Sequence, residues 1–262
     1  MNRTTTWLVA AAAIAAIAVL IYFFMLRPSG EPEAELAPPP PPAETAPAIE
    51  NPIPPAPVTE TPEPLPALDQ SDELVAQSLG EVVGEAPVES FLVPGDVIRK
   101  AVATVDNLDA KKLFPRIRAV QPAEGEFIVE REDDTIRLSE ENYGRYDKLV
   151  AAFGATSADQ LASVYYRYYP LFQQAYVELG YPSGYFNDRL VEVIDHLLAT
   201  PDITEPIELQ QPSVYYTFAD PDMEARSSGQ KLLLRMGPEN RAAVKQKLRE
   251  FRALIAARSP ES

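Results

Sequence analysis

The chain contains no cysteine and only one histidine, His196, among its 262 residues. Without cysteine there is no disulfide, no thiolate-bound metal and no cysteine nucleophile. A single histidine excludes every site that needs two or more imidazole ligands. Basic residues are also few: 23 Lys and Arg stand against 39 Asp and Glu, which leaves a net charge of −16. That balance argues against the whole chain being a nucleic-acid binder.

Charge is missing altogether from residues 7–26, an apolar run of 20 residues. A helix of that length rises about 30 Å, which is enough to cross the hydrocarbon core of a bilayer. Trp7 and Tyr22 suit the two interfaces of such a span. A cleaved signal peptide would need a shorter apolar core and a small-residue cleavage site, whereas this run ends in Phe-Phe-Met-Leu-Arg. We therefore predict an uncleaved signal anchor, preceded by a short cytoplasmic N-terminus at residues 1–6.

The orientation of this span rests on weaker evidence. Arg3 and Arg27 flank the span one to each side, so the positive-inside rule barely separates the two orientations. A single anchor followed by a large domain commonly exports that domain, and the absence of cysteine is compatible with an oxidising compartment. We predict a single-pass protein of a bacterial inner membrane with its C-terminal domain in the periplasm.

Proline is concentrated in residues 27–68, which hold 15 of the chain's 27 prolines and seven glutamates. Proline fixes φ and removes a hydrogen-bond donor, so this stretch favours neither a helix nor a sheet ladder. In a polyproline II conformation, at about 3.1 Å per residue, it reaches at most roughly 125 Å. We interpret it as a disordered stalk, with a ligand for a proline-recognition groove as the alternative.

Residues 69–258 form the predicted soluble domain, and residues 259–262 are a tail. The expected fold class is mainly α, with a minor β-hairpin, because apolar residues recur at helical spacing over most of the domain. The hairpin is predicted from β-branched runs at 127–130 and 135–138, and further strands are considered at 117–120 and 214–218. Helices are predicted after Ser71, after Ser139 and over 97–105, 158–179, 185–199, 230–236 and 239–257.

Two segments carry a resemblance to a known family. They are ELGYPSGYFNDRLVEVIDHLLATP at residues 178–201 and SGQKLLLRMGPEN at residues 228–240. Both are similar to segments of the domain of unknown function 3014 family, over about residues 69–255. The resemblance implies a bacterial protein with one N-terminal membrane span, a proline-rich stretch and this domain. It implies no activity, so no catalytic residue is carried over from it.

The best candidates for chemistry lie on the predicted helix at 185–199. Asp188, Glu192 and Asp195 share its polar face, and Glu192 is placed to orient His196 as a general base. Spare carboxylates there suit a hard cation. The same pattern is typical of any solvated amphipathic helix, and no nucleophile elbow, P-loop or dinucleotide-binding motif is present. We favour a structural role for these four residues and predict no cofactor and no metal site.

Basic residues gather at the C-terminal end of the chain. From Arg226 onwards there are nine basic residues and three acids, a side-chain net of +6, against −22 for the preceding 225 residues. One edge of the last predicted helix carries Arg241, Lys245, Arg249 and Arg252. We favour docking of this stripe onto the protein's own acidic surface. The alternatives are an anion-binding face for headgroups, cell-wall polymers or an acidic protein, and DNA if the domain is cytoplasmic.

Tyrosines cluster between residues 165 and 185. Their aromatic rings with polar tips suit sugars or peptides, although most of them fall on the predicted core stripe of the helix at 158–179. Tyr166 lies well off that stripe and is the candidate for partner binding.

Two hypotheses for the function follow. The first is a non-enzymatic envelope protein whose stalk-borne periplasmic domain binds another envelope protein or a cell-wall component. The second is a membrane-anchored hydrolase that acts on the cell wall or envelope through Asp188, Glu192, Asp195 and His196.

Overall fold

The computed structural model of the chain describes residues 48–53 and 64–256. The predicted membrane span at 7–26, most of the predicted linker and the tail at 259–262 lie outside these residues. Of the helices in the described part of the chain, none combines the length with the apolar composition that a bilayer span requires.

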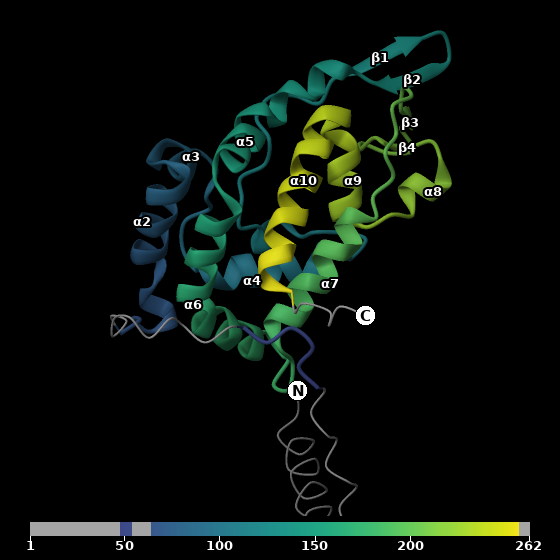
Figure 1. The fold of residues 1–262 in the computed structure, drawn as a ribbon. Helices are drawn as coiled ribbons and strands as arrows, with labels where there is room; N and C mark the ends of the chain where they lie inside the picture. Colours follow the sequence, from purple (N-terminus) through teal and green to yellow (C-terminus); the bar gives the residue numbers. More distant parts are fainter. Residues whose placement is uncertain (1–47, 54–63, 257–262) are drawn as a thin grey trace, which may run out of the picture. The chain divides into compact units, whose positions relative to one another are not determined.

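Helices make up most of the described residues, and a small antiparallel sheet accounts for the regular remainder, so the predicted mainly helical class with a minor β element is confirmed (Figure 1). The helices are α2 (Asp72–Val83), α3 (Glu85–Phe91), α4 (Val97–Asn107), α5 (Gly144–Ala155), α6 (Ala158–Leu179), α7 (Phe186–Leu198), α8 (Pro221–Glu224), α9 (Ser228–Arg235) and α10 (Gly237–Ile255).

Helix α6 begins and ends where the sequence predicts. Ser157 accepts a hydrogen bond from the backbone N–H of Gln160, whose side chain accepts one from the backbone N–H of Ser157 in return, so the pair forms a capping box. The helix continues through Pro170. Tyr165 and Tyr168 are buried, as the core stripe of this helix predicts, whereas Leu179 is 42% exposed because it lies in the last turn.

Helix α10 lies among the other helices and packs against α5, α6, α7 and α9 (Figure 1). The turn between α9 and α10 depends on Gly237, whose φ is 81°, and Pro238 follows in the first turn of α10. Glycine at the end of one helix and proline in the first turn of the next are typical of such a tight turn.

The sheet is an antiparallel meander in the order β1-β2-β3-β4. Its strands are β1 (Val129–Glu132), β2 (Thr135–Leu138), β3 (Glu208–Gln210) and β4 (Thr217–Phe218). The first strand of the hairpin begins two residues later than predicted, because the turn is confined to Asp133, whose φ is 50°, and Asp134. Of the strand considered at 214–218, only the last two residues form a strand, β4. Of the strand considered at 117–120, only Val120 takes part in β pairing, through an isolated bridge to Leu92.

Three of the named helices and strands were not predicted from the sequence: α3, β3 and the single-turn helix α8. Helix α3 follows Gly84, whose φ of 93° ends α2, and Pro87 is tolerated because it lies in the first turn. Strand β3 is three residues long, too short to show a period.

Three groups of buried apolar side chains make up the core. The largest lies between α2, α4, α6, α7 and α10. The second joins α5, α7 and α9, and the third places β2, β3 and β4 against Leu234 of α9. Helix α7 contributes to the first two, so its polar face is held rigidly against the body of the domain.

The folded unit begins earlier than residue 69. Leu68 is 4% exposed, and Leu65 and Ile53 pack against the largest core group. Residues 48–53 also hydrogen-bond to α7. The structure therefore differs from the sequence prediction for residues 48–53 and 64–68, which belong to the domain and not to a disordered stalk.

Candidate functional site

The polar face of α7 holds the four residues that the sequence proposes for chemistry. Asp188 lies in the first turn, where its Oδ1 accepts a 2.6 Å hydrogen bond from the backbone N–H of Asn51 and its Oδ2 accepts one of 3.1 Å from that of Glu50. Glu192, one turn later, accepts a 2.9 Å hydrogen bond from Arg189. These two carboxylates therefore serve different partners.

Arg189 is the centre of an ion-pair network on this face. Its side chain is 16% exposed and contacts Asp106, Asp109 and Glu192, each at 2.9 Å. Burial lowers the pKa of the Arg189 guanidinium, but the hydrogen bonds to the three carboxylates outweigh it, and the net pKa is raised. Tyr181 adds a hydrogen bond to Asp106. The network joins α7 to the end of α4, which is a structural task.

The last two candidates on α7 also have separate partners. Asp195 accepts a 2.8 Å hydrogen bond from Arg252 of α10, and the Nε2 atom of His196 lies 2.9 Å from the hydroxyl of Ser227. No hydrogen bond joins His196 to Glu192 in the described structure. Among residues 48–53 and 64–256, no group of three or more histidine, aspartate or glutamate side chains converges as a metal site would require.

The basic stripe on α10 is divided between the interior and the surface. Arg241 and Lys245 are 2% and 4% exposed. Lys245 donates to the backbone carbonyl of Thr200 at 2.8 Å and to Asp202 at 2.9 Å, while Arg241 donates to the carbonyl of Ile203 at 2.6 Å. Neither side chain is available to line an anion-binding face, because both bind the segment that follows α7. Hydrogen bonding to Lys245 lowers the pKa of Asp202.

The remaining two members of the stripe, Arg249 and Arg252, are exposed and partly exposed. Arg252 pairs with Asp195, which raises the pKa of its guanidinium. Arg249 is exposed, and the described residues offer it no ion pair. A continuous row of four cations for an anionic partner is therefore not present.

The tyrosines of α6 belong mainly to the core. Tyr165, Tyr168, Tyr169 and Tyr176 are all at most 9% exposed, and burial raises the pKa of Tyr176 to about 12. Tyr166 is half-buried, and its hydroxyl donates a 2.7 Å hydrogen bond to the carbonyl of Leu254 near the end of α10. Its polar tip is thus occupied by a contact within the domain.

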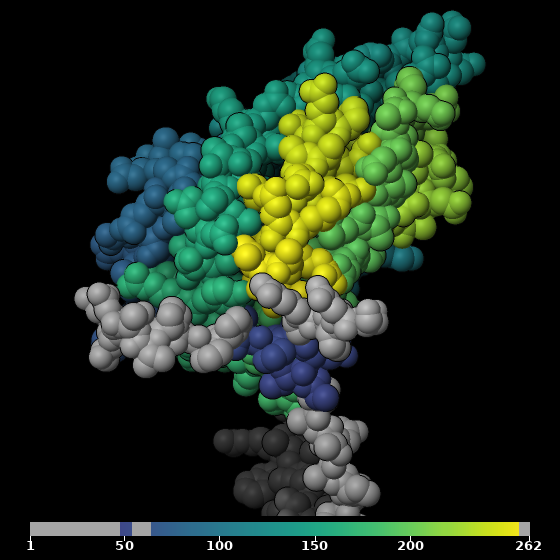
Figure 2. Space-filling view, viewed as in Figure 1, coloured from purple at the N-terminus to yellow at the C-terminus, as the bar shows by residue number. Residues whose placement is uncertain are grey.

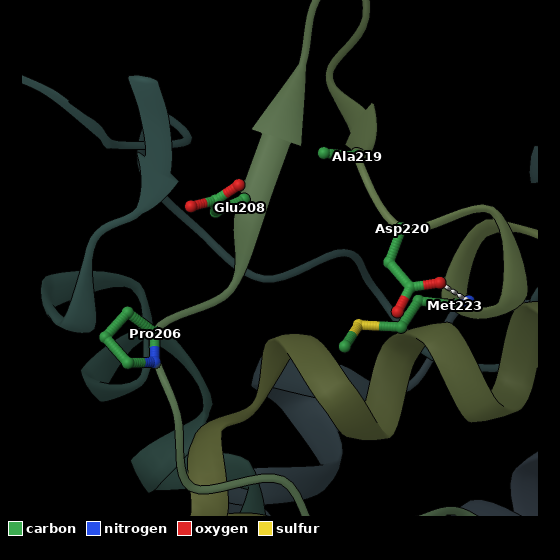
Figure 3. Close-up of a pocket in the computed structure, with 5 residues that line it drawn as sticks. All are labelled: Pro206, Glu208, Ala219, Asp220 and Met223. Atoms are coloured by element: carbon green, nitrogen blue, oxygen red, sulfur yellow. Dashed lines mark hydrogen bonds between the residues drawn. The ribbon is translucent and has the colours of Figure 1, made fainter. Parts of the chain in front are cut away.

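A cavity of about 430 Å³ lies beside the sheet. Figure 3 shows Glu208 on β3 and Asp220 after β4 at opposite sides of it, with Pro206, Ala219 and Met223 completing the lining. Asp220 caps α8 by accepting hydrogen bonds from the backbone N–H groups of Asp222 and Met223. The lining contains two carboxylates and no basic residue, and one of the two carboxylates is engaged in the cap of α8.

The connection between β3 and β4 exposes apolar side chains that sequence reasoning assigned to a strand. Val214 and Tyr215 are 83% and 79% exposed. Tyr216 next to them packs on Phe127 at 5.7 Å between ring centroids and accepts a 3.0 Å hydrogen bond from Arg131, so the base of this loop is fixed to β1. Pro212 and Ser213 before the apolar pair are turn residues and were the signal for a loop.

Comparison with known proteins yields one match. The family model described as "Protein of unknown function (DUF3014)" matches residues 97–252, which span α4 to α10 and include the whole sheet. No curated protein matches the chain, and no solved structure does. Since the matched region is more than half of the chain and contains most of its folded part, the chain belongs to the DUF3014 family.

Proposed function

We propose that this chain is a membrane-anchored protein of the bacterial envelope whose helical domain binds another envelope component without catalysing a reaction. The observation that supports the binding role is the exposed apolar pair Val214 and Tyr215 on a loop whose base is fixed by Tyr216. Two large apolar side chains exposed side by side on an anchored loop are typical of a protein contact. The predicted span at 7–26 and the proline-rich linker support the tether.

The alternative, a membrane-anchored hydrolase, needs Asp188, Glu192, Asp195 and His196 to act on one substrate. Each of these side chains has a different partner in the fold, and the side chain of Glu192 is 68% exposed. No observation on this face favours catalysis.

Site-specific photo-crosslinking in living cells tests the binding role. A photoreactive phenylalanine analogue replaces Tyr215 in the full chain, and a control chain carries it at Val177 of α6, which is 41% exposed. We expect a discrete crosslinked product from position 215 that is absent from position 177. The additional change Val214→Asp should remove that product while leaving the amount of the chain unchanged. Equal crosslinking from both positions, or none from position 215, would refute the proposed surface.

A further inference from the structure

The N-terminal end of α7 holds a short segment of the chain that is more than 130 positions away in sequence. This segment, residues 48–53, is called the clip below. Figure 2 shows it, in purple, against the domain below the end of α10. The residues of α7 and its N-cap that contact it are Tyr185, Asn187 and Asp188, and they are called the clip site.

The clip site pairs with every backbone N–H in residues 50–53. Asp188 accepts from the N–H groups of Glu50 and Asn51, and the hydroxyl of Tyr185 accepts from that of Ile53 at 2.9 Å. Pro52 has no N–H to satisfy. Because two successive N–H groups bind one carboxylate, these contacts require a bend at Glu50 and Asn51, where the chain does bend, and they place proline where no donor is needed.

Asn187 shows that the site is built for a ligand of this kind. It is fully buried, and its side-chain amide donates to the backbone carbonyls of Asn51 and Ile255, each at 2.8 Å, while its oxygen accepts from Tyr165. With the clip bound, both N–H groups of this buried amide have acceptors, as a buried amide requires. The carbonyl of Asn51 supplies one of the two.

Side chains of the clip add selectivity. The Asn51 amide donates to Asp188 at 3.1 Å, and Ile53 packs against the largest core group. Ile49 is 54% exposed and contributes little. The ligand that fits is a peptide with the sequence Asn-Pro-aliphatic that bends at the asparagine.

We propose that the clip site is a peptide-binding site for an Asn-Pro-aliphatic segment that bends at the asparagine, and that its occupant is the chain's own clip, bound in cis and able to exchange. When the clip is bound, the linker ends at residue 48, where the chain joins the domain. When the clip is released, the linker ends at residue 64 and is longer by the 16 residues 48–63. If the linker is the tether proposed above, the site sets its length. The binding itself does not depend on that function.

Hydrogen exchange of the full chain in detergent micelles tests the contact. The rate at residues 50–53 is compared in the wild type, in Asp188→Ala and in the matched control Glu192→Ala, which removes a carboxylate of α7 that pairs with Arg189 only. We expect exchange to accelerate about tenfold or more in Asp188→Ala and to stay unchanged in Glu192→Ala. Equal rates in the wild type and Asp188→Ala would overturn the proposal.

Peptide binding tests exchange of the occupant. A fluorescent peptide of residues 46–57 is titrated into the full-length wild type and into the full-length double variant Asn51→Ala with Ile53→Asp, whose own clip is impaired. We expect the peptide to bind the double variant at least about tenfold more tightly, because the tethered clip competes at millimolar effective concentration. Adding Asp188→Ala to the double variant should abolish binding.

Two outcomes of the titration contradict the proposal. Binding that is equal in the two chains, or absent from both, would show that the clip is not an exchangeable ligand. Loss of protection at residues 50–53 on dilution of the wild type, together with dissociation of a dimer, would identify a second copy as the source of the occupant and refute binding in cis.

Discussion

Gly237 at the start of α10 lies where no other residue fits. Its φ of 81° is in the left-handed region, and a Cβ at this position would clash with the ring of Tyr143. The backbone conformation and the packing against Tyr143 therefore both require glycine at this position. Gly154 in α5 is the opposite case, because it has helical neighbours and a Cβ added there would have no other atom within 4 Å.

These two glycines predict opposite effects of the same substitution. Gly237→Ala should lower the free energy of unfolding by about 2 to 4 kcal/mol, from backbone strain and the clash with Tyr143. Gly154→Ala should raise it by up to about 1 kcal/mol, since alanine favours a helix. Urea unfolding of the full chain in detergent, followed by circular dichroism, measures both. A neutral Gly237→Ala would show that the α9–α10 turn can rearrange.

At the scale of the element, α10 explains where the basic C-terminal charge is used. Lys245 donates to the carbonyl of Thr200, directly after α7, and also reaches Asp202. Cations are favoured at the end of a helix, where carbonyl groups lack partners. Helix α10 therefore fixes the end of α7 through buried side chains, in addition to their apolar contact.

Members of the basic stripe on α10 should differ in how much they contribute to the free energy of unfolding. Lys245→Ala leaves the carbonyl of Thr200 and one side of Asp202 without a partner, and should cost about 2 kcal/mol. Arg249→Ala, on the same edge but exposed, should change the free energy of unfolding by less than about 0.5 kcal/mol. The same urea unfolding experiment compares them. Equal losses would mean that the stripe acts through its net charge and not through these hydrogen bonds.

The sequence predicts an element well where its signals are local. Ser157 and Gln160 mark the start of α6, because a capping box needs residues only three apart. Gly237 marks a turn, because glycine is the residue that most readily adopts the positive φ found there. The first strand of the hairpin is predicted two residues too early, because the β-branched run at 127–130 continues into β1 and does not show where pairing starts.

Long-range contacts were beyond the reach of such signals. Asp188 looked like any acid on a solvated helix face, and its partners Glu50 and Asn51 lie in a proline-rich stretch whose composition indicates disorder. Arg241 and Lys245 share an edge with Arg249, and only the fold shows which of them is buried. Helical spacing identifies a face, but it does not identify what covers that face.

At the scale of the whole molecule, the charge asymmetry has a structural use. The C-terminal part is basic against an acidic remainder, and several of its cations bind oxygen atoms elsewhere in the domain. Those with side-chain hydrogen bonds are Lys231, Arg241, Lys245, Lys247 and Arg252. Such internal use leaves a predominantly acidic surface, which agrees with the burial of Arg241 and Lys245 in the stripe on α10. An acidic surface weighs against DNA as a partner even for a cytoplasmic domain.

The predicted anchor at residues 7–26 makes the topology of the chain testable independently of any partner. Alkaline phosphatase and a fluorescent reporter that matures only in the cytosol are fused after Ser262 in separate chains. Because export carries the C-terminus across the membrane, we expect phosphatase activity without fluorescence. Deletion of residues 7–26 is the control and should exchange the two signals.

Each other outcome corrects a specific part of the prediction. Fluorescence without phosphatase activity would place the domain in the cytoplasm, and the Val214–Tyr215 loop would then face a cytoplasmic partner. A mature protein that starts after residue 26 would show that the apolar run is a cleaved signal peptide, so the domain would be released from the membrane. In that case the clip would no longer set the length of a tether, whereas its binding to Asp188 and Asn187 would remain, since those contacts lie within the folded unit. The length of the linker therefore matters to function only if the anchor is retained.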